Sequence, residues 1–192
     1  MLIRGKELMT MPLAFSLIFF SSFAIYFFFG LYVLVLNVNS NLHWVFFASC
    51  ISLCFWAFAF SIANSAPDYE TCLLWRRIAC LGWGTYFSVL LHFILILTNH
   101  SQLLKKKRLY MLLYFPAVVT VFAFCISPSA GGIYHLHYVE AGWVNIPGST
   151  IWDSWFNLYY ASFSMIGAGL VLQWGITAKD GRMKKQSLQM GA

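Results

Sequence analysis

The most constraining feature of the sequence is a series of long apolar segments separated by short polar ones. Apolar runs of about 20 residues recur along the chain, and about 20 such residues in a helix cross roughly 30 Å of hydrocarbon. Only 9% of the residues are charged, whereas a soluble domain carries roughly 25%. Because so few charges cannot cover a water-soluble core, we predict an all-α integral membrane protein.

Five membrane-spanning helices are expected, in one domain that covers residues 1–192. Their approximate bounds are 11–36, 43–63, 69–98, 108–126 and 151–177. The first segment is interpreted as a retained span, since it is longer than a signal-peptide apolar region and no obvious small-residue cleavage site follows it. Residues 127–150 form the longest expected connection, a loop. Pro116, inside the fourth segment, should kink that helix and free a carbonyl for a neighbouring helix to satisfy.

The distribution of basic residues predicts the orientation in the membrane. Connections that are rich in Lys and Arg stay in the cytoplasm, and two such clusters lie on the same side of a five-span chain. We therefore expect the N-terminus and the 127–150 loop outside and the C-terminus in the cytoplasm, although Arg4 and Lys6 argue mildly against this. The two clusters are Lys105, Lys106, Lys107 and Arg108, and then Lys179, Arg182, Lys184 and Lys185.

Several classes of function are disfavoured by the same observations. The net charge of +6 comes from basic residues at the ends of apolar runs, so we expect lipid rather than nucleic acid as a partner. The five cysteines are odd in number and form no CxxC, which predicts neither a disulfide framework nor a metal cage. No catalytic motif is found, and we expect neither a cofactor nor catalytic residues.

Ionisable residues are scarce at membrane depth. The central thirds of the predicted spans contain no Asp, Glu, Lys or Arg, which weighs against an ion-coupled transporter. His92 is either a hydrogen-bonded packing residue or a proton relay. Arg76 and Arg77, near the outer end of the third span, either anchor the helix at the interface or pair with an anionic ligand or a carboxylate such as Asp153.

The 127–150 loop is the most ligand-like segment. It combines glycines with aromatic and polar residues, as a small-molecule pocket requires, although a loop that only caps the bundle needs the same types. His135 and His137 would face one side of an extended strand and could hold a metal, but two histidines without further ligands are weak evidence, and no metal site is predicted. The candidate sensing residues are Arg77, Tyr134, His135, His137, Trp143 and Asp153.

Residues of the second and third segments resemble the N-terminal seven-transmembrane sensor region of bacterial histidine kinases and some diguanylate cyclases. Trp56 is followed by an outer turn with proline and acidic residues at 67–70, and then by a Trp-x-Arg-[Ile/Leu]-x-x-x-Gly pattern. The further matching features are the apolar run His92–Thr98, Pro116, the polar outer loop and the basic segment Arg182–Gln186.

This resemblance implies a sensory transmembrane module in the bacterial cytoplasmic membrane. Its signal would be a small molecule or a change of membrane state. Its pattern would continue through two more spans into a dimerising helix and a kinase or cyclase domain, which this sequence does not reach. We therefore expect a fragment, or a chain that acts as a homodimer or with a separate effector. The alternatives are a small transporter or channel subunit and, disfavoured by the lack of paired carboxylates, a lipid-modifying enzyme.

Overall fold

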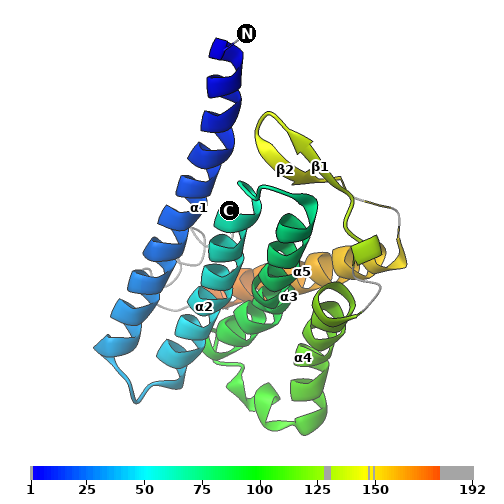
Figure 1. Cartoon of the computed structure of the whole chain (residues 1–192). Coiled ribbons are helices and arrows are strands. Elements are labelled where there is room, and N and C mark those ends of the chain that lie inside the picture. Colours follow the sequence, from blue (N-terminus) through cyan, green and yellow to red (C-terminus); the bar gives the residue numbers. More distant parts are fainter. Residues whose placement is uncertain (1, 128–130, 147, 149, 178–192) are drawn as a thin grey trace.

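The computed structural model describes residues 2–127, 131–146, 148 and 150–177, and its architecture is a bundle of long helices with one β-hairpin (Figure 1). The basic segment after residue 177 lies outside the described residues. The elements, in chain order, are α1 (Leu2–Leu36), α2 (Asn41–Ala63), α3 (Tyr69–Leu97), the 3-10 helix η1 (Ser101–Lys105), α4 (Lys107–Val121), the π-helical turn η2 (Phe122–Ile126), β1 (Leu136–Val139), β2 (Gly142–Asn145) and α5 (Ile151–Thr177).

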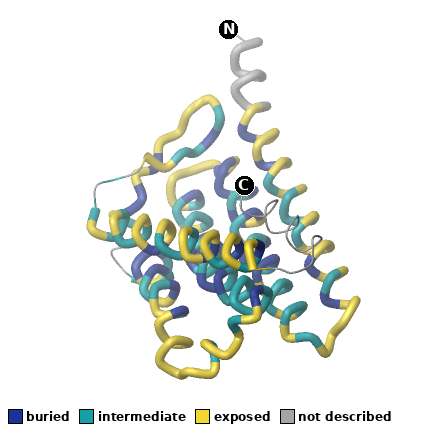
Figure 2. Tube along the Cα trace, turned by 180° about the vertical axis from the view of Figure 1, so that it is seen from behind, coloured by how far each residue is buried: buried dark blue, intermediate teal, exposed yellow. Residues whose placement is uncertain are grey.

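The five α-helices agree with the predicted spans. Each is long and apolar enough to cross a membrane, with η2 extending the fourth segment to Ile126. Large apolar side chains cover the outside of the bundle, as the exposed stretches of α1 and α5 in Figure 2 illustrate; Met165 of α5, for example, is 74% exposed. Such a surface is compatible with lipid and not with water.

Within the expected loop at 127–150, residues 136–145 form an antiparallel hairpin. Tyr138 pairs with Trp143 and Val139 with Gly142. Gly142 adopts a φ of 103°, and a Cβ there would lie 2.5 Å from the Asn64 carbonyl oxygen, so only glycine fits this close approach to the end of α2.

α3 is the central helix of the bundle. It packs against α2, α4 and α5, whereas α1 packs mainly against α2. Its first turn is capped by the exposed carboxylate of Asp68, which accepts hydrogen bonds from the Thr71 amide (2.8 Å) and hydroxyl (3.0 Å). The Thr71 amide, with the Thr71 hydroxyl as the second contributor, lowers the pKa of Asp68 below its ordinary value.

A buried polar contact near Pro116 joins α3, α4 and α5. The Ser88 hydroxyl of α3 donates to the Leu113 carbonyl one turn before the proline, at 2.6 Å. Tyr159 of α5 is within hydrogen-bond distance of both the Ser88 amide (2.9 Å) and the Ser88 hydroxyl (2.7 Å). All three helices are thus joined by one buried group of hydroxyls.

A cluster of buried residues lies at the hairpin end. Small side chains of α2 and α3, such as Ala63 and Cys72, pack there with Phe124 of η2, Tyr134 and Leu136. The hairpin is therefore part of the packed structure and covers the ends of the helices.

Candidate ligand-binding site

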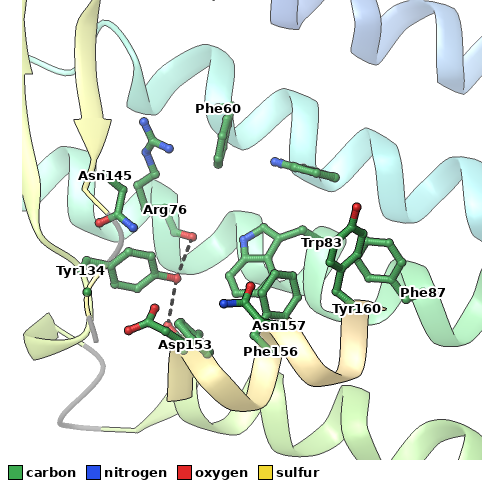
Figure 3. Close-up of a pocket in the computed structure, with 13 residues that line it drawn as sticks. Phe60, Arg76, Trp83, Phe87, Tyr134, Asn145, Asp153, Phe156, Asn157 and Tyr160 are labelled. Carbon is green, nitrogen blue, oxygen red and sulfur yellow. Dashed lines mark hydrogen bonds between the residues drawn. The ribbon is translucent and has the colours of Figure 1, made fainter. Parts of the chain in front are cut away.

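A cavity of about 530 Å³ lies between α2, α3 and α5 beneath the hairpin (Figure 3). Its volume is within the range of small-molecule sites. The lining residues are Trp56 and Phe60 of α2; Arg76, Trp83 and Phe87 of α3; Phe124; Tyr134; Asn145; Gly148; and Asp153, Phe156, Asn157 and Tyr160 of α5.

Helical periodicity explains why these side chains meet. Arg76, Trp83 and Phe87 recur at spacings of seven and four residues, which places them on one face of α3. The α5 residues 153, 156, 157 and 160 follow the same rule. The cavity thus lies between one face of α3 and one face of α5, with α2 as a third wall and the hairpin across one end.

The two ends of the cavity differ in chemistry. Figure 3 shows Arg76, Asn145, Tyr134 and Asp153 grouped at the hairpin end, while aromatic rings such as Trp83 surround the other end. A site with an apolar body and a few convergent polar groups has the usual composition of a small-molecule pocket.

Arg76 is the cation of this cavity. Its Nη2 donates to the Trp143 carbonyl at 2.5 Å, and its guanidinium carbon lies 4.2 Å from the centroid of the Phe60 ring, a cation–π distance. Its Nε is shielded from solvent and has no hydrogen-bond partner among the described residues.

Arg77 points to a different neighbour. Its Nε and Nη2 donate to the Cys125 carbonyl at 2.9 and 2.7 Å, and weaker contacts reach the carbonyls of Ile126 and Ser127. It thereby satisfies carbonyls at the end of η2, and it does not line the cavity. The acceptors of both arginines are carbonyl oxygens, whereas Asp153 bonds to Thr150.

Tyr134 and Asp153 are the two predicted sensing residues that line the cavity. The Tyr134 hydroxyl donates to the carbonyls of Arg76 (3.4 Å) and Phe124 (3.3 Å), and burial raises the pKa of this phenol far above its ordinary value, so it stays neutral. Asp153 forms a capping box with Thr150: the Thr150 amide donates to Oδ2 (3.0 Å), and the Asp153 amide donates to the Thr150 hydroxyl (3.2 Å).

The other predicted residues of the 127–150 segment lie outside the cavity lining. His135 and His137 are exposed on either side of the buried Leu136, and within the described residues no group of three or more His, Cys, Asp or Glu could hold a metal ion. The Trp143 indole donates to the Ala66 carbonyl at 2.9 Å, and its ring contacts Tyr69 and Tyr138. These contacts of Trp143 hold the hairpin against the turn that follows α2.

The comparison with protein families identifies the chain. A model of the N-terminal 7TM region of histidine kinase matches residues 15–192. The chain belongs to this family. No curated protein and no solved structure matched the chain.

Membership of this histidine kinase sensor family confirms the resemblance noted in the sequence. The chain is a multi-pass membrane protein and a sensor region rather than a catalytic domain, and the alternative of a transporter or channel subunit is not favoured.

Sequence reasoning chose Arg77 as a sensing residue, whereas the arginine that lines the cavity is its neighbour Arg76. It also missed Asn145, Asn157 and the rings of α3 and α5. One signal was present in the sequence: Arg76, and not Arg77, continues the face of the third span that carries Trp83 and Phe87.

Proposed function

We propose that this chain is the sensory membrane module of a bacterial signalling protein and that a small molecule bound between α2, α3 and α5 is its signal. The observation that carries the proposal is the cavity itself, because its walls belong to three different helices. A ligand that fits one packing of these helices better than another shifts the equilibrium between the packings.

α5 offers a route from the cavity to the rest of the bundle. It carries Asp153, Phe156 and Asn157 on the cavity wall, and also Tyr159, which is bonded to Ser88 of α3. Since Ser88 donates to Leu113, a displacement of α5 would disturb the contact between α3 and α4. The packing change would then reach an effector, attached to the module or associated with it, such as a kinase or cyclase domain.

The proposed orientation places the hairpin and the N-terminus outside and η1 in the cytoplasm of the bacterium. The basic run Lys105–Arg108 supports it, because such runs are retained on the cytoplasmic side. Alkaline phosphatase fused after Arg108 should be inactive and green fluorescent protein at the same position fluorescent. Active phosphatase there would reverse the proposed orientation.

The sensory role can be tested by measuring distances between helices. Spin labels at Met111→Cys on α4 and Met165→Cys on α5, both exposed positions, would be read by pulsed electron paramagnetic resonance in nanodiscs with Cys125 replaced by Ala. Fractions of a bacterial metabolite extract should shift the distance distribution.

A matched pair of variants ties this response to the cavity. Asn157→Trp places a large ring in the cavity wall and should abolish the shift, whereas Leu158→Trp, on an exposed residue outside the lining, should preserve it. A distance that no fraction changes, or that changes equally in both variants, would refute the sensory role of the cavity.

A further inference from the structure

The hairpin end of the cavity contains the positive charge of Arg76. In the part of the chain that the structure describes, Arg76 bonds to the Trp143 carbonyl and stacks on Phe60, and it forms no ion pair. Arg76 lines the cavity, so a ligand that brings an anionic acceptor to its guanidinium gains a charge-assisted hydrogen bond there.

Asn145 supplies a second donor at the same end of the cavity as Arg76. Its Oδ1 accepts a hydrogen bond from the His135 amide at 2.8 Å, which fixes the orientation of the side-chain amide. The Nδ2 group, which carries two N–H donors, is thereby left on the opposite side, and Figure 3 shows it directed toward the cavity. Arg76 and Asn145 together offer donors of the kind that a carboxylate accepts.

Asp153 limits the charge that such a ligand carries. It lies across Tyr134 from Arg76 in Figure 3, and its Oδ2 is occupied by the amide and hydroxyl of Thr150 at the start of α5. The positive end of the helix dipole offsets part of its charge. The remainder repels additional negative charge, which favours a single anionic group held on the Arg76 side.

Apart from the Asn157 amide, the rest of the cavity suits an apolar body. Trp83 and Phe156 are in edge-to-face contact with centroids 4.6 Å apart, and Phe87 lies 6.2 Å from Phe156. These rings present apolar surface next to the polar end, and burying the hydrocarbon part of a ligand against them is favourable in proportion to the area removed from water.

We propose that the cavity binds an amphipathic monoanion, with its carboxylate on Arg76 and Asn145 and its hydrocarbon or aryl body among Trp83, Phe87 and Phe156. This assignment of a ligand class rests on the proposed sensory function. It requires no metal and no covalent step.

The test uses 4-phenylbutyrate as the anionic probe and 4-phenylbutyramide, its uncharged analogue of the same shape, as the control. Binding to the full chain in nanodiscs is measured by isothermal titration calorimetry at pH 7.5, with empty nanodiscs as the blank for partition into lipid. We expect the carboxylate to bind about 10-fold more tightly than the amide, because hydrogen bonds to charged groups are the stronger ones.

Asn145→Asp is the decisive variant. It retains the oxygen that accepts from His135 and replaces the donor group by a second acceptor with a negative charge, so the hairpin keeps its bond while the cavity loses its anion contact. We expect the affinity for 4-phenylbutyrate to fall at least about 10-fold and the affinity for the amide to change little. Arg76→Gln should remove the preference for the carboxylate, whereas Arg77→Gln should change either affinity by less than about twofold, since Arg77 faces Cys125.

Equal affinity for the two probes in the wild-type chain, or unchanged carboxylate binding in both Asn145→Asp and Arg76→Gln, would overturn the proposal. Tighter binding of the dianion benzylsuccinate than of the monoanion would overturn the assignment of a single charge. If neither probe binds while metabolite fractions still shift the spin-label distances, the ligand class is wrong and the sensory role stands.

Discussion

Replacing Gly82 by alanine should separate α2 from α3. An added Cβ at Gly82 would lie 2.5 Å from the backbone nitrogen of Trp56, 2.9 Å from its Cβ, and also against the carbonyl oxygen of Ser52. Two of these three atoms are backbone, so no change of rotamer relieves the overlap. The helices would have to part by about 1 Å to restore an ordinary van der Waals distance, and a gap of that size forfeits a quarter to a half of the dispersion energy between facing atoms.

The expected destabilisation follows from these distances. Overpacking costs about 1–3 kcal/mol where side chains can adjust, and a clash with backbone belongs at the upper end of that range or above it. The higher helix propensity of alanine returns at most about 1 kcal/mol. We therefore expect Gly82→Ala to lower the free energy of unfolding by about 2 kcal/mol or more.

Gly169→Ala on α5 is the matched control, because a Cβ at that position meets no atom within 4 Å. It should leave the stability unchanged or raise it by up to about 1 kcal/mol. Unfolding would be followed by circular dichroism as micelles of a mild detergent are titrated with dodecyl sulfate. If both variants unfold at the same dodecyl sulfate fraction as the wild type, the inference of close backbone packing at Gly82 is refuted.

The remaining predictions use the same unfolding assay. Tyr159→Phe removes a hydroxyl that is bonded to the Ser88 amide and hydroxyl, and it should lower the free energy of unfolding by about 1 kcal/mol. Tyr160→Phe, at a residue that is 47% exposed, should lower it by less than about 0.5 kcal/mol. Equal effects of the two variants would exclude the Ser88 link. Arg77→Gln should lower the free energy of unfolding by about 1–2 kcal/mol by weakening the bonds to the Cys125 carbonyl, and wild-type stability would contradict that role. The Asp68 pKa is lowered in the folded state, so its stabilising contribution is present above the pKa of an unfolded aspartate, about 3.9, and is lost as the pH falls through the lower folded value. Asp68→Asn still caps α3 but does not titrate, and it should flatten this acid dependence; an unaltered pH profile would exclude the cap as its source.

The helices could be predicted from the sequence because their driving force is local. Each apolar segment must satisfy its own backbone in lipid, so its length and flanking polar residues determine the span, as the near agreement for 69–98 and Tyr69–Leu97 illustrates. The register of the hairpin could not be predicted, because it depends on tertiary contacts: Trp143 bonds to Ala66 after α2, and Gly142 packs on Asn64.

The candidate site depended even more on packing. Tyr134 and Asp153 were identified by their residue types, but the arginine of the cavity could not be chosen by type, since Arg76 and Arg77 are adjacent and chemically identical. A rotation of about 100° per residue around the helix sends one toward the cavity and the other toward η2. Asn145 acquires its role through the His135 amide, a contact that has no signature in the sequence.

By itself, then, the sequence determined that five segments of the chain are long and apolar enough to cross a membrane and that the chain resembles a sensor, because hydropathy and span length are properties of each segment alone. Only the tertiary structure decided where a ligand could bind. The cavity exists because faces of α2, α3 and α5 meet under a hairpin, and which faces meet depends on contacts such as that of Gly82 with Trp56.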